Sequence, residues 1–240
     1  MDDFEQIQAY DSDEQEALYM EYFRVFQGIL VSLEAVEVLK EIERPDTPSS
    51  SSYIKAAKEL QSYFINAGAI KEVIDTLPQV SSLAFSHDQQ CFYIIGKAIR
   101  NKVAHEGLWT PTYRTAYKLT NNWQPTTRSF AFTTEEVIKS INQLYAKRQY
   151  GATDKEQRKA QRDNQKLLDA KSFIQLIDDK GYLDIIAFTS RHAALLFPVY
   201  IKLMEQAYRD SKMQSLSTLR SDFNLTTIDD QLSRLHAKLQ

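Results

Sequence analysis

Residues 22–39 read YFRVFQGILVSLEAVEVL, and this stretch decides the fold class of the chain. Its apolar side chains recur every three or four residues, at Tyr22, Val25, Phe26, Ile29, Leu33, Val36 and Leu39. That period places them along one face of an α-helix, whereas a half-buried strand would alternate. The pattern predicts a long helix over residues 14–43 that buries this face against the rest of the protein.

The composition extends the helical interpretation to the whole chain. Of 240 residues, 6 are glycine and 6 are proline, and this is about half of the usual share. Sandwiches, barrels and α/β folds need turn-forming residues every few positions, so the shortage argues against all three classes. We therefore expect an all-α fold of long helices joined by few loops.

Helix start and stop signals divide the chain after the first helix. Two prolines and a serine run at residues 44–52 end that helix, and Ser52 can cap a second helix over residues 53–67. Gly68 permits a stop or a kink before a short helical segment at residues 69–77.

Capping boxes, in which two side chains satisfy each other's free backbone N–H groups, mark three more helix starts. They are Ser86 with Gln89, Thr133 with Glu136, and Thr153 with Glu156. They predict helices over residues 87–106 and 134–148, and a third helix of about 25 residues.

The remaining segments carry weaker signals. Residues 108–132 resemble a loop, in which only the alternating SFAF at residues 129–132 predicts one short strand. Gly181 predicts a break, followed by one or two buried helices over residues 182–211 with a kink at Pro198. Residues 228–239 predict a last, amphipathic helix.

The charge is distributed unevenly. Residues 1–46 hold 13 acidic and 3 basic residues, a net charge of 3 − 13 = −10. Residues 89–134 hold 6 basic residues and one acidic residue, a net charge of 6 − 1 = +5, interleaved with aromatic side chains. Such a stretch suits single-stranded nucleic acid, which offers phosphates and stackable bases. The alternative is a core helix followed by an aromatic loop with a solvated basic face.

Several function classes lack their signatures. The sequence contains no apolar stretch of the roughly 20 residues that a membrane span needs, and its acidic start is unlike a signal peptide. Phosphate-binding glycine loops and hydrolase motifs are also missing. One cysteine and four scattered histidines support neither a disulfide nor a metal site. We expect a cytoplasmic protein with no membrane partner, cofactor or metal.

The most informative segment is RNKVAH, residues 100–105. On a helix, Phe92, Ile95, Ile99 and Val103 form a core stripe, with Asn101 on the opposite side. Lys97 and His105 lie one turn before and after Asn101, so the three predict a polar ridge, toward which Arg100 can swing.

These side chains have the chemistry that metal-free RNA cleavage requires. A neutral imidazole can remove a proton from a hydroxyl group. A guanidinium can hold a phosphate with two hydrogen bonds and offset the charge that develops on it. An asparagine can orient either partner. The substrate would supply its own nucleophile, the ribose 2′-hydroxyl, which DNA lacks.

The segment IRNKVAHEG, at the end of an amphipathic helix, resembles the HEPN superfamily (higher eukaryotes and prokaryotes nucleotide-binding domain). Arg100, Asn101 and His105 match its signature of an arginine and a histidine four to six residues apart. The resemblance implies an up-and-down antiparallel helical bundle that dimerises with the two motifs facing each other. It also implies a metal-independent endoribonuclease, of the kind common in toxin–antitoxin and anti-phage systems.

The resemblance covers residues 14–150, so we expect a HEPN-like bundle over residues 1–150 and a C-terminal helical extension over residues 151–240, packed into the same domain or beside it. It implies that Arg100 stabilises the scissile phosphate, His105 acts as general acid or base, and Asn101 positions them. Five further residues are candidate RNA contacts: Lys97, Lys102, Trp109, Tyr113 and Arg114.

Other interpretations of the same residues stay open. The chain could be a non-catalytic helical module that binds a nucleotide, RNA or a partner protein, and its acidic first 46 residues suit a basic toxin or antitoxin. It could also be a structural dimer whose motif orders its own interface. Arg100 could pair with an acid of the first helix, and His105 could favour the helix dipole. We interpret Cys91 and His192 as structural.

Overall fold

The computed structural model of the chain describes residues 2–42, 49–77, 85–105, 111–117, 125–146, 154–178, 180–210 and 216–239. Its helices are α1 (Asp2–Ile42), α2 (Ser50–Thr76), α3 (His87–His105), α4 (Thr134–Ala146), α5 (Asp154–Ile177), α6 (Ile185–Asp210), α7 (Leu216–Asp222) and α8 (Leu225–Leu239). Its strands are β1 (Thr112–Tyr117), β2 (Pro125–Thr133) and β3 (Tyr182–Asp184). The chain is therefore mostly helical, as its composition predicts.

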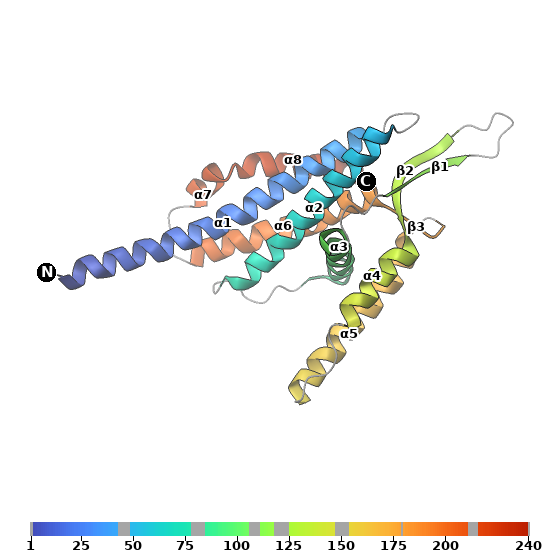
Figure 1. Cartoon of the computed structure of the whole chain (residues 1–240). Coiled ribbons are helices and arrows are strands. Elements are labelled where there is room, and N and C mark those ends of the chain that lie inside the picture. The colour runs from blue at the N-terminus through green and yellow to red at the C-terminus, as the bar shows by residue number, and fades with distance from the viewer. Residues whose placement is uncertain are drawn as a thin grey trace.

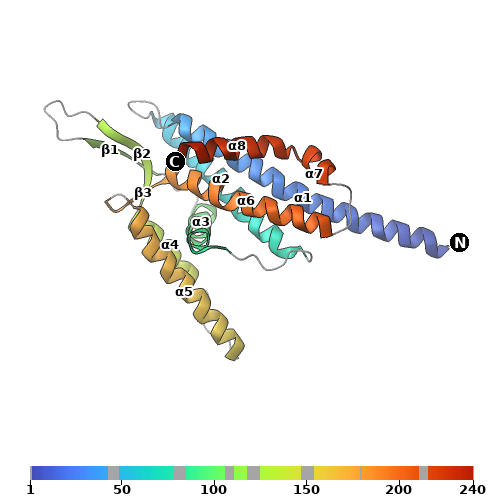
Figure 2. The same cartoon turned by 180° about the vertical axis from the view of Figure 1, so that it is seen from behind.

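The helices form a bundle from which the helix pair α4 and α5 and the strand pair β1 and β2 project (Figure 1). The long helices α1 and α2 run antiparallel side by side, and α6 packs against both (Figure 1). The helix α3 contacts α2, α4, α5 and α6, so it lies between the bundle and the projecting pair α4 and α5 (Figures 1 and 2). The residues of interest in α3 therefore face neighbours on several sides.

A small sheet accompanies the helices, and it is larger than the one short strand that the sequence predicts. The strands β1, β2 and β3 form an antiparallel sheet in that order, with Tyr113 opposite Phe130 and Phe132 opposite Leu183. The predicted strand at residues 129–132 lies within β2, but β1 falls in the segment predicted to be a loop. The loop prediction was wrong because Thr112–Tyr117 carries residues with β propensity but no apolar alternation, so only its pairing with β2 reveals it.

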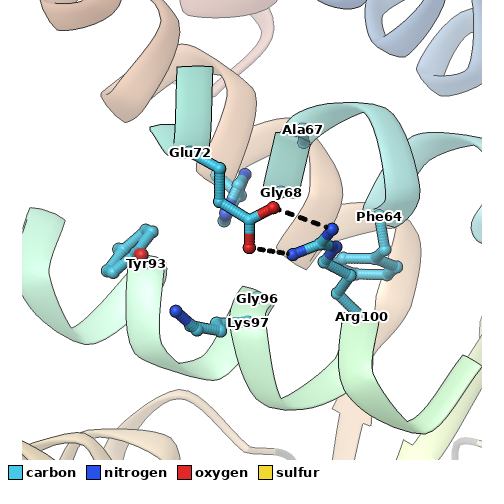
Figure 3. A pocket seen from close by; sticks show the side chains of 9 residues that line it. Phe64, Ala67, Gly68, Glu72, Tyr93, Gly96, Lys97 and Arg100 are labelled. Carbon is cyan, nitrogen blue, oxygen red and sulfur yellow. Dashed lines mark hydrogen bonds and ion pairs between the residues drawn. The ribbon is translucent and has the colours of Figure 1, made fainter. Parts of the chain in front are cut away.

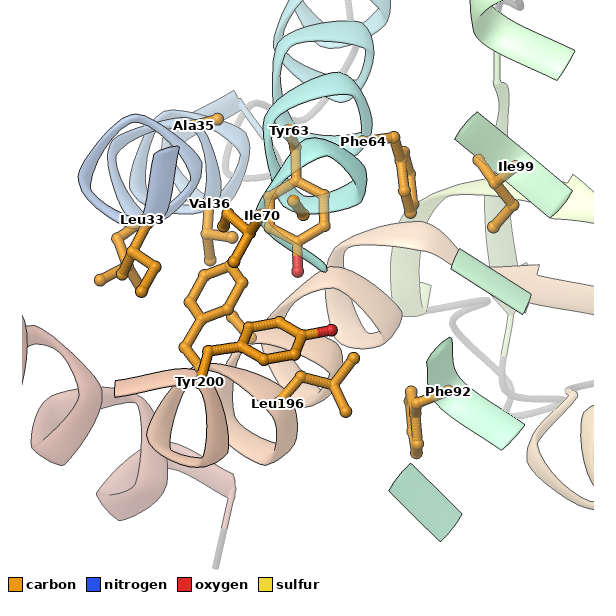
Figure 4. Close-up of a cluster of buried hydrophobic side chains, with 14 of the residues drawn as sticks. Leu33, Ala35, Val36, Tyr63, Phe64, Ile70, Phe92, Ile99, Leu196 and Tyr200 are labelled. Atoms are coloured by element: carbon orange, nitrogen blue, oxygen red, sulfur yellow. The ribbon is translucent and has the colours of Figure 1, made fainter. Parts of the chain in front are cut away.

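One apolar core joins the two halves of the sequence. Its fully buried side chains include Leu33 and Val36 of α1, Tyr63 and Ile70 of α2, and Tyr200 of α6. Figure 4 shows these side chains converging between the three helices. Residues on both sides of position 150 thus contribute to the same buried cluster.

The helix starts follow the capping signals closely. The Ser86 N–H donates to Gln89 Oε1 at 3.0 Å, and the Gln89 N–H donates to Ser86 Oγ at 3.3 Å. Thr133 and Glu136 form the same reciprocal pair at 3.2 and 3.3 Å. Both predicted capping boxes are confirmed, because a local side chain satisfies N–H groups that the helix itself leaves free. The third, at Thr153, lies outside the described residues.

Other helix ends differ from the predictions. The helix α1 begins at Asp2 rather than near residue 14, and α2 is capped by Ser49, whose Oγ accepts from the Ser52 N–H at 3.3 Å. The segment predicted to be helical from residue 182 begins with β3, after Gly181 at φ +83°. The helix α6 then continues through Pro198, and α7 was not predicted. None of the described helices is both long and apolar enough to cross a membrane.

Gly68 does not break its helix. The helix α2 is continuous over Ser50–Thr76, so the predicted second and third helical segments are one element. A glycine inside a helix costs only about 1 kcal/mol relative to alanine, which the packing of a long buried face easily offsets. Its location reflects a tertiary contact with Arg100 instead.

Candidate functional site

A pocket lies where α2, α3 and α6 meet (Figure 3). It is lined by Phe64, Ala67, Gly68 and Glu72 of α2, Tyr93, Gly96, Lys97 and Arg100 of α3, and His192 of α6. Its free volume is about 10 Å³, close to the space of one water molecule. The pocket contains the arginine of the sequence motif, and we call it the Arg100 pocket.

Arg100 forms a bidentate ion pair with Glu72 across the pocket. Arg100 Nη2 donates to Glu72 Oε2 at 3.1 Å, and Arg100 Nη1 donates to Glu72 Oε1 (Figure 3). Arg100 thus has an acidic partner, as one of the alternatives allowed, but this partner lies in α2 and not in the first helix. The Arg100 side chain is 22% exposed and that of Glu72 is 52% exposed, so solvent screens the pair and its contribution to stability is about 0–1 kcal/mol.

Two glycines in helix interiors make the pocket possible. A Cβ atom on Gly68 would lie 2.2 Å from Arg100 Cδ, and a Cβ atom on Gly96 would lie 2.5 Å from His192 Nε2. A larger residue at either position would therefore force the side chain that now fills the space to move. Gly68 therefore lets Arg100 lie across α2, and Gly96 lets the imidazole of His192 approach α3.

His192 is buried in an aromatic environment. It is 4% exposed and lies beside the rings of Tyr63, Phe64 and Phe188. Burial lowers the pKa of His192 from 6.5 to about 3, because the surroundings poorly solvate an imidazolium. Its Nδ1 atom is 2.7 Å from the hydroxyl of Tyr63, which also donates to the backbone oxygen of Thr189 at 3.0 Å. The imidazole is therefore neutral and held in one orientation.

The pocket carries an excess of positive charge. Lys97 lies 5.9 Å from the centre of the Tyr93 ring, and Lys71 lies 5.8 Å from the same centre. Lys71 also pairs with Asp75. Among the lining residues, Lys97 and Arg100 outweigh Glu72, a formal charge of 2 − 1 = +1 with His192 neutral. An anion is the natural ligand for this arrangement.

The motif helix has the predicted core stripe. Phe92, Ile95, Ile99 and Val103 are at most 3% exposed. The opposite side is less open than a solvent-facing ridge, because Lys97, Asn101 and Lys102 are all half-buried. Asn101 does not line the Arg100 pocket. The structure therefore groups Arg100 with Lys97 and leaves Asn101 on another part of α3.

The other candidate residues lie at the edge of the described structure. His105 is the last residue of α3, and its side chain is outside the description. Trp109 also lies outside it. Tyr113 and Arg114 belong to β1, where they pair with Phe130 and Ser129, and their side chains are not described either. Their proposed contacts with RNA therefore stay predictions.

Sequence reasoning missed two residues of the pocket. Glu72 is 28 positions from Arg100, and His192 meets Tyr63 across 129 positions, so neither pairing has a local signal. The available signal is the glycine inside each helical pattern, because such a glycine points to a close approach by another group. Gly68 and Gly96 both mark such an approach.

Neither a reactive cysteine nor a metal site is found among the described residues. Cys91 is 1% exposed, and its thiol pKa is raised to about 11 by burial and by the charges of Asp169 and Asp88, so it stays a protonated thiol. Within the described part of the chain, no three His, Cys, Asp or Glu side chains gather as a metal site requires. The expectation that Cys91 is a small buried side chain is confirmed.

The chain was compared with protein-family models, with curated proteins and with solved structures, and none of them matches. The resemblance to the HEPN superfamily therefore depends on the segment IRNKVAHEG, residues 99–107, and on its helical setting.

Proposed function

We propose that the protein is a metal-independent endoribonuclease of the HEPN type that cleaves RNA at a site composed of two chains. The proposal is based on the guanidinium of Arg100. Both of its Nη atoms already bind a carboxylate, that of Glu72, in a pocket of net positive charge. A carboxylate and a phosphate present similar pairs of oxygen atoms to this group. The setting we favour is toxin–antitoxin or anti-phage defence.

A phosphate can take the place of Glu72. The Arg100–Glu72 pair is partly open to solvent, so separating it costs about 1 kcal/mol or less. The phosphate would gain Lys97 as a second cation at the same time. The pocket is thus closed by an ion pair that a stronger anionic ligand can displace.

The reaction follows from the chemistry of RNA. The ribose 2′-oxygen attacks the adjacent phosphorus, and its proton passes to His105 acting as base. The bond from phosphorus to the 5′-oxygen breaks, and that oxygen takes a proton from the His105 of the second chain. The products end in a 2′,3′-cyclic phosphate and a 5′-hydroxyl. Arg100 offsets the charge that develops on the phosphate, and Asn101 positions the reacting groups.

Incubation of the full chain with RNA in the presence of a chelator tests the proposal. We expect fragments that end in 2′,3′-cyclic phosphate, and we expect Arg100→Ala and His105→Ala to abolish them. The matched control is Arg24→Ala, which removes an arginine that also pairs with a surface glutamate, Glu21. Intact RNA with the wild-type chain would overturn the catalytic proposal.

The same assay distinguishes the endoribonuclease from the alternative, a module that binds RNA without cleaving it. If RNA binds and stays intact, and if binding survives His105→Ala, the chain is a binding module. Light scattering at micromolar concentration tests the homodimer, because a composite site requires two chains. A monomer would contradict the proposed reaction.

A further inference from the structure

One side of α1 carries a long row of exposed side chains. Positions that alternate between four and three residues apart lie along one side of a helix, because seven residues make almost two turns. In α1, such a row lies beside the buried face and is formed by Glu16, Met20, Phe23, Gln27, Leu30, Glu34, Glu37 and Glu41. All of these residues are exposed except Leu30, which is half-buried. We call this row the outer stripe of α1.

The outer stripe includes an apolar patch. Met20 and Phe23 are each 45% exposed, and Tyr19, which is next to Met20, is 38% exposed. The centre of the Tyr19 ring lies 5.1 Å from that of Phe223, so the segment between α7 and α8 holds one edge of the patch in place. A cluster of large apolar side chains at the surface is typical of an interaction site. Methionine suits such a surface, because its flexible side chain adapts to a partner.

The outer stripe is also acidic. Glu16, Glu34 and Glu41 form no ion pair within the described part of the chain. Glu37 pairs with a lysine one turn away. The sequence adds to this charge, because residues 2–23 hold eight acidic residues and no basic residue, a net charge of 0 − 8 = −8. The stripe therefore combines exposed apolar side chains with carboxylates that lack a cation.

This charge determines which kind of molecule can cover the stripe. RNA and anionic lipids carry phosphate groups, which the carboxylates repel. A second copy of the same stripe is repelled as well, because glutamates would face glutamates along the packed helices. A basic partner is attracted by the same charges. Since the stripe has the spacing at which two helices pack together, the matching surface of the partner is itself a helix.

We propose that the outer stripe binds an amphipathic helix of a partner protein, and that this helix carries lysine or arginine beside its apolar residues. The apolar side chains of the partner helix cover Met20 and Phe23, and its cations face the unpaired glutamates. The inference is independent of RNA cleavage, because the stripe belongs to α1 and the Arg100 pocket lies between α2, α3 and α6.

The stripe is long enough for such a helix. From Glu16 to Glu41 it extends over 41 − 16 = 25 residue steps, or about 37 Å. At the acidic end, α1 continues past the other helices of the bundle (Figures 1 and 2). Because the side chains of the stripe are already exposed, a partner helix can bind along α1 without displacing another element.

Binding of a synthetic helix to the full chain tests the inference. The probe is a fluorescent peptide of four heptads, with leucine along one stripe and lysine at the positions beside it, and its anisotropy reports binding. We expect binding that weakens by about tenfold from low to high salt concentration, because charges contribute to it. The control peptide has glutamate in place of every lysine and should not bind.

Two variants of the chain assign the binding to the outer stripe. Met20→Ser combined with Phe23→Ser removes the apolar patch and should weaken binding by about tenfold. Glu34→Lys reverses one charge and should weaken binding by about fivefold. The matched controls are Leu168→Ser and Glu135→Lys, which change an exposed leucine of α5 and an exposed glutamate of α4. Both controls should bind the peptide as the wild type does.

A second measurement needs no variant. In a chain labelled at the methionine methyl groups, the lysine peptide should shift the resonance of Met20. It should leave unchanged the resonance of Met204, which is buried in α6.

Three results would overturn the inference. The first is equal binding of the lysine and glutamate peptides, and the second is peptide binding that neither stripe variant weakens. The third is a homodimer that dissociates when Met20 and Phe23 are both changed to serine, because a second copy of the chain would then occupy the stripe. None of these results bears on the cleavage of RNA, which is measured separately.

Discussion

Among the described residues, two arginines line cavities between helices, and they differ in how completely nearby carboxylates neutralise their charge. Arg100 pairs with one carboxylate, Glu72, and shares its pocket with Lys97. Arg220 of α7 bridges two carboxylates, Glu205 of α6 and Asp229 of α8. Around Arg220, the helices α6, α7 and α8 line an open groove with about 310 Å³ of free volume, compared with about 10 Å³ at Arg100.

The comparison shows that volume and readiness to bind an anion are separate properties. The groove at Arg220 is lined by Lys202 and Arg220 against Glu205 and Asp229, a formal charge of 2 − 2 = 0. Burial alone lowers the pKa of Arg220, but the charges and hydrogen bonds of Asp229 and Glu205 outweigh it and raise the pKa. That arginine is held as a structural link. The smaller pocket keeps one positive charge in excess, because Lys97 and Arg100 face only one carboxylate, Glu72.

The largest expected effect contrasts the two arginines directly. Arg100→Ala should lower the rate of RNA cleavage by a factor of about 100 or more, the usual cost of removing a group that stabilises the transition state. Arg220→Ala should change the rate less than about twofold per folded molecule, because its charge is already neutralised. The measurement is the rate of formation of 2′,3′-cyclic phosphate ends. An equal loss of cleavage rate in the two variants would contradict the claim that only the pocket at Arg100 binds the phosphate.

The next effect is a dependence of stability on pH. Because the pKa of His192 is about 3 in the folded chain and 6.5 when unperturbed, only the unfolded chain takes up this proton as the pH falls below 6.5. Proton uptake favours the unfolded chain. The contribution of the neutral His192 to the free energy of unfolding is therefore present above pH 6.5 and is lost progressively down to about pH 3. From pH 7 to pH 5, the wild type should lose about 2 kcal/mol relative to His192→Phe.

Urea denaturation of both chains at the two pH values measures this difference, in which the contributions of the other titrating groups cancel. A wild type and a variant with the same pH dependence would contradict the assignment of a buried neutral imidazole.

The two glycines should respond differently to alanine. Gly96→Ala brings a Cβ atom within 2.5 Å of a buried ring that cannot move away, and we expect a net loss of about 1–2 kcal/mol in the free energy of unfolding. Gly68→Ala meets the flexible end of Arg100, which can swing into solvent, so stability should change by less than about 1 kcal/mol. Thermal unfolding of both variants measures the two losses of stability. A larger loss in Gly68→Ala than in Gly96→Ala would contradict the distinction between a mobile Arg100 and a fixed His192.

The smallest effect concerns the carboxylates. Glu72→Gln removes the negative charge that competes with a phosphate, so RNA should bind about threefold more tightly. Glu205→Gln, the corresponding change beside Arg220, should leave RNA affinity unchanged. Titration of both variants at constant salt provides the comparison. Weaker binding in Glu72→Gln would show that Glu72 supports the ligand rather than competing with it.

The sequence predicts the parts of this molecule that depend on local interactions. The capping boxes at Ser86 and Thr133 and the core stripe of α3 follow from spacing alone, since their partners lie within one turn. The strand β1 was missed because it depends on pairing with β2. Glu72 and His192 were missed as pocket residues because their contacts cross between helices.

The residues of the site show the same contrast between what local sequence predicts and what contacts between helices determine. The arginine of the motif was identified because its residue type and spacing carry a chemical meaning. Its actual partner is fixed by Gly68, which brings α2 and Arg100 together. His192 was expected to be structural, and its bond to Tyr63 supports that interpretation. The close approach of its second nitrogen, Nε2, to Gly96 could not be predicted, because it depends on which atoms lie opposite it in space.

A crystal structure of the His105→Ala chain with a short RNA tests the central claim most directly. We predict that a phosphate of the RNA replaces Glu72 at the guanidinium of Arg100, with its oxygen atoms about 3 Å from the guanidinium nitrogens. An intact Arg100–Glu72 pair, with the RNA bound elsewhere on the molecule, would contradict it.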